Sequence, residues 1–268
     1  MAEPAPTTCT DIVSSAVDPD EYLSLVKPFL LLATRAEDLA ADDEYAEFLR
    51  CGGLEEFQLE RRRLERDPLG AIDMDRYSGL ILGGSPFTIT DPEPEKSPAQ
   101  VRVEAELIGL MDEVIDRDFP FLGACFGIGI IGRHQGAVID RTHPEPVGAT
   151  TVRLTENGRA DPLFGVLPEI FEAFAGHKEA ISKLPQHAIH LAASDACPVQ
   201  AFRVGANVYA TQFHPELDVP GIQNRIEIYK DYGYFAADEA QELKDAAARS
   251  HVVHPPSLVS RFVELHQR

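Results

Sequence analysis

The sequence is short of basic residues. It has 24 lysines and arginines against 44 aspartates and glutamates, and its formal net charge is −20 at pH 7. A surface of that sign repels the phosphates of nucleic acids and of anionic membranes. We therefore expect neither a nucleic acid nor a membrane among its partners.

Paired cysteine motifs and long apolar runs are also missing. None of the four cysteines belongs to a C-x-x-C pair, so we expect no metal site and no thioredoxin-like site. The first residues have no basic stretch followed by an apolar one, which argues against a signal peptide. No apolar run approaches the roughly 18 residues of a membrane span. These absences predict a cytoplasmic protein, in which a free thiol persists.

Apolar runs alternate with amphipathic segments in the first half of the chain. Strands are predicted at 28–34, 56–64, 77–82 and 119–123, and the apolar runs at 28–34 and 77–82 read as central or buried strands. Helices are predicted at 38–50, 99–117 and 125–134, and the apolar positions of the first of these are Leu39, Tyr45, Phe48 and Leu49. Strands that alternate with helices predict a parallel sheet covered on both faces.

The pattern changes after residue 136. Short strand-like runs with few helices between them continue to residue 213, which predicts a smaller, partly antiparallel extension of the sheet. Helices are predicted after it, at 221–248 and 256–267. We expect an α/β fold with an open, mainly parallel sheet flanked by helices. The predicted organisation is a loose tail at 1–20, a main domain at 21–220 and a helical extension at 221–268.

One cysteine stands between glycines. The stretch 123–127, GACFG, follows a predicted strand and opens a predicted helix. Its glycines permit a tight or left-handed turn and leave room around the Cys125 thiol, as in a nucleophile elbow. The helix N-terminus favours the thiolate. Taken alone, the motif also fits a buried, inert cysteine.

A candidate partner for this thiol follows the predicted strand at 209–213. There the sequence reads His214-Pro215-Glu216. Residues i and i+2 of an extended segment point to the same side, and Pro215 keeps His214 out of the helical region. Glu216 can therefore orient the His214 ring toward the thiol. Cys125, His214 and Glu216 are the predicted catalytic nucleophile, base and orienting acid.

A glycine pair completes the predicted site. Gly83 and Gly84 follow the apolar strand at 77–82 and precede Ser85 and Pro86. Backbone N–H groups in such a turn can bind an oxyanion. No Gly-Lys-Ser/Thr follows, so a nucleotide-binding loop is not expected. No cofactor is predicted.

These motifs, in this order and spacing, resemble the class I glutamine amidotransferase family, most of all stand-alone members similar to the amidotransferase domain of GMP synthase. The resemblance covers residues 28–218. It implies an open α/β fold, a Cys125–His214–Glu216 triad, and oxyanion donors at the N–H groups of Gly84 and Phe126. It also implies hydrolysis of the glutamine side-chain amide through a γ-glutamyl thioester, with ammonia passed to an unidentified acceptor or synthetase partner.

Two positions bear on the substrate that the resemblance implies. His177 lies in a Gly-His-Lys-Glu stretch where GMP synthase-like members have Ser-His-Gly-Asp. With Gly83 and Ser85 it is a candidate substrate-binding residue, although a surface loop fits His177 nearly as well. Gly129 stands where many members have a glutamine or a histidine, and the glutamine helps to bind the amino-acid end of the substrate. This departure leaves free glutamine in question as the substrate.

Other functions remain open at this point. A γ-glutamyl peptidase or hydrolase would use the same thioester with an amine or amino acid as leaving group. A cysteine α/β-hydrolase fits the elbow, but there the acid precedes the histidine by many residues. A non-enzymatic module of the same fold would have no need of an intact triad. No ATP-pyrophosphatase domain is expected in the roughly 50 residues after Glu216, so we do not expect this chain to make GMP alone.

Overall fold

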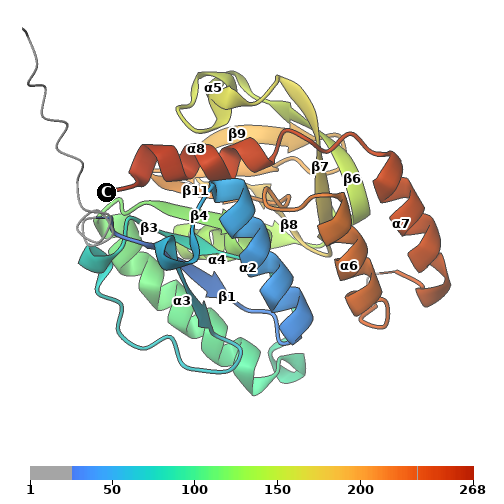
Figure 1. The fold of residues 1–268 in the computed structure, drawn as a ribbon, viewed down its shortest axis with the longest axis horizontal. Helices are drawn as coiled ribbons and strands as arrows, with labels where there is room; N and C mark the ends of the chain where they lie inside the picture. The colour runs from blue at the N-terminus through green and yellow to red at the C-terminus, as the bar shows by residue number, and fades with distance from the viewer. Residues whose placement is uncertain (1–25, 234) are drawn as a thin grey trace, which may run out of the picture.

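A nine-stranded sheet with helices on both faces forms the centre of the molecule (Figure 1). This computed structural model describes residues 26–233 and 235–268. The predicted tail at 1–20 lies outside the described residues. The strand order is β2-β1-β3-β4-β11-β10-β9-β6-β7, and β5 and β8 pair separately.

The first part of the sheet is parallel. Its strands are β2 (Leu59–Arg63), β1 (Phe29–Ala33), β3 (Gly79–Leu82), β4 (Phe121–Ala124) and β11 (Val208–Thr211). All but the edge strand β2 are continuous apolar runs, as expected for strands that are buried on both faces. β2 begins three residues later than predicted, because a 3₁₀ turn occupies Glu56–Gln58.

The second part of the sheet is antiparallel. It contains β10 (Ala201–Val204), β9 (Ile189–Ser194), β6 (Glu145–Leu154) and β7 (Ile170–His177), and the separate pair is β5 (Val138–Asp140) with β8 (Ala180–Lys183). The predicted fold class, an open and mainly parallel α/β sheet with an antiparallel extension, is confirmed.

Helices cover the two faces of the sheet. They are α2 (Asp38–Gly52), α3 (Pro98–Asp116), α4 (Phe126–Gln135), α5 (Glu156–Ala160), α6 (Val219–Tyr229), α7 (Ala240–Arg249) and α8 (Pro256–His266). Further 3₁₀ turns lie at Met74–Arg76, Glu93–Glu95, Phe164–Val166 and Ala237–Glu239. In the part of the chain described, no helix combines the length and the apolar character needed to cross a membrane.

The side-chain alternation of β1 divides the core in two. Phe29 and Leu31 pack with α2 and α8 on one face, and Leu30 and Leu32 pack with α3 and α4 on the other. A third apolar cluster lies under α6 and α7, which run side by side next to β6 (Figure 1). The C-terminal helix α8 therefore shares the core of the predicted main domain.

Two helical predictions need correction. The sequence predicts Leu39 on the buried face of α2, but it is 60% exposed, and the buried stripe carries Glu44 and Glu47 instead. The segment predicted as helical at 221–248 consists of α6 and α7 with a break between them, where Gly233 takes a positive φ of 74°. Both differences matter for the site, because the two glutamates and α6 face it.

Candidate active site

Cys125 lies in a strained turn between β4 and α4. Its φ is 51° and its ψ is −89°, a conformation that costs a non-glycine residue about 1–3 kcal/mol. A Cβ on Gly123 would meet the backbone of Gly127 at 3.0 Å. The two glycines are therefore what allows strand and helix to approach so closely, and the turn leaves the thiol partly exposed.

The start of α4 supplies backbone donors beside the thiol. Phe126 is the first residue of α4, and N–H groups in the first turn of a helix have no acceptor within that helix. The Cys125 N–H donates to the Thr211 carbonyl at 2.8 Å, which ties the elbow to β11. This placement suits the oxyanion role predicted for Phe126.

The structure brings His214 and Glu216 to the same point. The His214 N–H donates to the Phe174 carbonyl at 2.9 Å, which holds the segment after β11 in an extended form. The His214 Nδ1 atom lies 2.8 Å from Glu216 Oε1. With Nδ1 so engaged, Nε2 is the ring atom left to act on the Cys125 thiol, and both residues line one cavity. The three residues thus have the order of a triad.

Charge and burial compete at this pair. Burial lowers the pKa of His214, but the charges of Glu216 and Cys125 outweigh it and raise that pKa to about 9. Burial raises the pKa of Glu216, and the positive charges of His214 and Arg225 bring it down to about 2. At neutral pH the two side chains therefore form an imidazolium–carboxylate pair.

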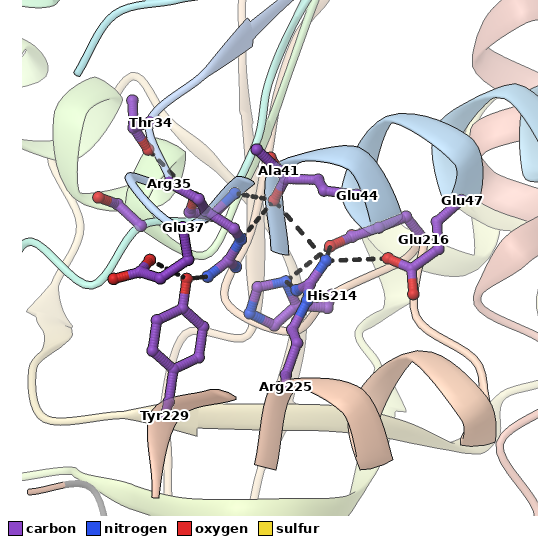
Figure 2. A network of polar contacts seen from close by, with 12 residues as sticks. Thr34, Arg35, Glu37, Ala41, Glu44, Glu47, His214, Glu216, Arg225 and Tyr229 are labelled. Carbon is purple, nitrogen blue, oxygen red and sulfur yellow. Dashed lines mark hydrogen bonds and ion pairs between the residues drawn. The ribbon is translucent and has the colours of Figure 1, made fainter. Parts of the chain in front are cut away.

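Arg225 on α6 is a further member of the site (Figure 2). Its Nη2 atom lies 3.1 Å from Glu216 Oε1 and 2.9 Å from Glu47 Oε2. The motifs in the sequence did not indicate it. A usable signal was present, however, because Arg225 interrupts the otherwise apolar stripe formed by Ile222, Ile226 and Tyr229.

Glu44 binds the glycine pair from the side of α2. Its Oε1 atom accepts from the Gly84 N–H at 3.1 Å and from Arg35 Nε at 3.0 Å (Figure 2). A Cβ on Gly83 would fall 2.4 Å from Glu44 Oε2. In this conformation the Gly84 N–H is directed at Glu44, so its predicted oxyanion role requires the peptide to turn. That role stays a prediction.

Two cavities meet at Cys125, and Ser85 and Gly176 line both. We call the first the α6 cavity; it encloses about 510 Å³, including space open to solvent, between α6 and β7, and His214 lines it. We call the second the Glu179 cavity; it encloses about 410 Å³ and is lined by Glu179, Lys178 and Gly129.

Two neighbouring side chains, Ile89 and Glu179, fill the space beside Gly129. A Cβ there would meet Ile89 Cδ1 at 2.9 Å and Glu179 Oε1 at 3.5 Å. The Glu179 carboxylate accepts from the N–H groups of Ile89 at 2.9 Å and Thr90 at 2.8 Å. A carboxylate therefore lies where the family's glutamine side chain would begin. Glu179 belongs to the Gly-His-Lys-Glu stretch, but the sequence did not predict it to be a site residue.

His177 lies beside this cavity with both ring nitrogens engaged. They contact the Glu145 carboxylate at 2.9 Å and the Glu179 carbonyl at 2.8 Å. The contact with the carbonyl supports the loop that carries Glu179. A direct role in substrate binding stays a prediction for His177, as it does for Gly83 and Ser85.

Glu145, His177 and Cys197 bring their potential metal-ligand atoms within 4.8 Å of one another. The Glu145 oxygens already accept hydrogen bonds from Thr150, Ser194 and Gln200. Burial raises the pKa of the Cys197 thiol to about 12, so it stays protonated. This donor set is poorly suited to a metal ion.

Comparisons with known proteins agree with the motifs. The family model for glutamine amidotransferase class-I matches residues 50–224. A protein of Thermoplasma volcanium, named as one of the subunits of a glutamine-hydrolysing GMP synthase, is 35% identical over 162 residues, which cover 59% of this chain and 71% of that protein. Its counterpart in Methanocaldococcus jannaschii is 31% identical over 152 residues, or 56% and 71% of the two chains.

Solved structures show the same fold. A glutamine amidotransferase from Thermotoga maritima superposes with a TM-score of 0.70 at 22% identity, covering 90% of this chain and 98% of that one. A glutamine amidotransferase from Methylobacillus flagellatus gives a TM-score of 0.65 at 18% identity, covering 91% and 96%.

Proposed function

The chain belongs to the class I glutamine amidotransferase family, and we propose that it cleaves a γ-glutamyl amide, with glutamine the first candidate substrate, through a thioester on Cys125. The observation that carries the proposal is the strained Cys125 turn beside the His214–Glu216 pair, whose contact is 2.8 Å. A strained nucleophile next to an oriented base is what acyl transfer requires.

The proposed reaction begins with the Cys125 thiolate beside the His214 imidazolium. The sulfur attacks the γ-carbonyl carbon, and the carbonyl oxygen becomes an oxyanion near the Phe126 N–H. The C–N bond then breaks, and His214 gives its proton to the departing nitrogen. Water attacks the thioester with His214 as base, and glutamate leaves as Cys125 regains its thiolate. Glutamine yields ammonia, and a substituted amide yields an amine.

Glu216 and Arg225 position the base in this scheme. Glu216 is fully buried and holds His214 through Nδ1. Arg225 Nη2 contacts Glu216 Oε1 at 3.1 Å, so the carboxylate is held from a second side. A buried carboxylate needs such a partner to remain ionised.

The Glu179 cavity suits the amino-acid end of the substrate. Its carboxylate is held by two backbone N–H groups and lies beside Gly129. An α-ammonium group placed there would gain a charge-assisted hydrogen bond. We assign to Glu179 the recognition that a glutamine at position 129 provides in other family members.

The ammonia would pass to a synthetase partner or another acceptor. The Thermoplasma and Methanocaldococcus relatives are each named as one of several subunits of a glutamine-hydrolysing GMP synthase, and a separate synthetase chain is a fitting partner here too. The second candidate, a γ-glutamyl hydrolase, is favoured by one observation, the α6 cavity on the His214 side of Cys125. Membership of this family argues against a cysteine α/β-hydrolase. Because the relatives are glutamine-hydrolysing enzymes, a non-enzymatic module is disfavoured as well.

The direct test is to incubate purified protein with glutamine and to measure glutamate and ammonia. Added hydroxylamine should divert part of the product to γ-glutamyl hydroxamate, because it intercepts a thioester. Cys125→Ala is the matched control. Glutamate release that persists in this variant would rule out the proposal.

A further inference from the structure

We propose that the α6 cavity binds the leaving group. The preferred substrates are then γ-glutamyl amides of amines whose substituent is apolar and carries no charge. This inference rests on the proposed function, because it assumes the Cys125 thioester. It adds a substrate class and a binding subsite to that chemistry. Three observations support it: the position of His214, the apolar lining of the cavity and the pairing of its charged groups.

The position of His214 decides which cavity holds which half of the substrate. In the tetrahedral intermediate the acyl chain and the leaving nitrogen point in different directions from the carbon bonded to sulfur. The nitrogen must face His214 to be protonated. His214 lines the α6 cavity and is absent from the lining of the Glu179 cavity. The leaving group therefore belongs in the α6 cavity, and the glutamyl half in the Glu179 cavity.

The lining of the α6 cavity is larger and more apolar than ammonia requires. Its apolar walls come from β6, β7, α6 and two residues outside the ends of α6. They are Val147, Ala175, Leu217, Ile222, Ile226 and Phe235. Ammonia needs no more space than one water, whereas six apolar side chains line this cavity. Apolar walls of this kind stabilise a hydrocarbon group by removing it from water.

The charged groups of the cavity are already paired. Arg35 and Arg225 reach its lining, but Arg35 contacts Glu44 at 3.0 Å and Arg225 contacts Glu216 at 3.1 Å and Glu47 at 2.9 Å. Three buried carboxylates, Glu44, Glu47 and Glu216, thus face three positive groups, which are the two guanidinium groups and the His214 imidazolium. A leaving group with its own carboxylate, such as an amino acid, would find no unbalanced positive charge here. This favours simple amines over γ-glutamyl peptides.

The experiment compares four substrates on the full chain: glutamine, γ-glutamyl methylamide, γ-glutamyl benzylamide and γ-glutamylglycine. Glutamate release gives kcat/KM for each. We expect the benzylamide to exceed both glutamine and γ-glutamylglycine at least tenfold. Equal or higher values for glutamine would overturn the inference and favour ammonia release alone. Higher values for γ-glutamylglycine would overturn it in favour of a peptidase.

A variant at the edge of the cavity locates the effect. Val147→Phe narrows the α6 cavity and should lower the ratio of kcat/KM for the benzylamide to kcat/KM for glutamine at least tenfold. Val166→Phe is the matched control, because Val166 is 46% exposed and lines neither cavity. An equal effect of Val147→Phe on both substrates would contradict the assignment. Glutamine turnover without benzylamide turnover defeats this inference alone, whereas no turnover of any substrate defeats the proposed function as well.

Discussion

The Gly84 Cα faces the edge of the His214 ring so closely that a Cβ there would lie 2.5 Å from Cε1. It would also lie 2.6 Å from Arg35 Nη2. The second glycine of the pair is therefore needed for space beside the His214 ring. Its backbone N–H, which donates to Glu44, is a separate feature of the same residue.

Gly84→Ala should displace the His214 ring and lower kcat at least tenfold, with a smaller change in KM. Overpacking of this kind also costs about 1–3 kcal/mol of stability. Steady-state kinetics and thermal unfolding measure the two effects. Gly109→Ala is the control, because a Cβ at position 109 of α3 meets nothing within 4 Å. A Gly84→Ala enzyme with unchanged kcat would contradict the geometry.

His214→Ala should reduce the rate more than Glu216→Gln does. The first variant removes the group that transfers the proton, and the second removes only the charge that orients it. Glu216→Gln should also lower the pKa of His214, because the largest charge that raises it to about 9 is lost. Titration of the ring by NMR measures this shift. Rates equal to that of wild type in both variants would show that His214 and Glu216 do not act as a catalytic base and its orienting acid.

Glu47→Gln should change how stability depends on pH. Burial raises the pKa of Glu47 from 4.5 to about 7, although Arg225 opposes the shift. Between these values the folded protein keeps a proton that the unfolded chain has released. Stability therefore falls as pH rises through this window, by at most about 3 kcal/mol. Denaturant unfolding from pH 4.5 to 8 should show this fall in wild type and a weaker one in the variant. Parallel curves would contradict the assigned titration.

Glu179→Gln should raise KM for glutamine with little change in kcat. The loss of one charged hydrogen bond to the α-ammonium group costs about 1.5–3 kcal/mol, or roughly a tenfold to hundredfold rise in KM. Glu242→Gln, an exposed position on α7, is the control. A lower kcat at constant KM would show instead that Glu179 serves the loop at Ile89 and Thr90 and not the substrate.

The strands and the contact between His214 and Glu216 were predictable because their patterns are local. β1 and β3 are continuous apolar runs between turn signals, and Cys125 stands between two glycines at the end of such a run. His214 and Glu216 share one extended segment, so their contact follows from their spacing.

The charged network behind the triad was not predictable in the same way. Glu44, Glu47 and Arg225 are charged residues in buried positions, and a search for apolar periodicity counts them as exposed. Their pairing joins α2 to α6, which lie far apart in the sequence. The orientation of the Gly84 peptide is likewise absent from the residue pattern, because a peptide plane can turn without any change of sequence.

The central claim is a covalent γ-glutamyl intermediate on Cys125. Rapid acid quenching during turnover, followed by peptide mass analysis, tests it most directly. We predict a mass increase of one γ-glutamyl group on the peptide that contains Cys125, and no such increase in Cys125→Ala. A protein that turns over substrate without this adduct, or that carries it at Cys51 or Cys197, would contradict the account.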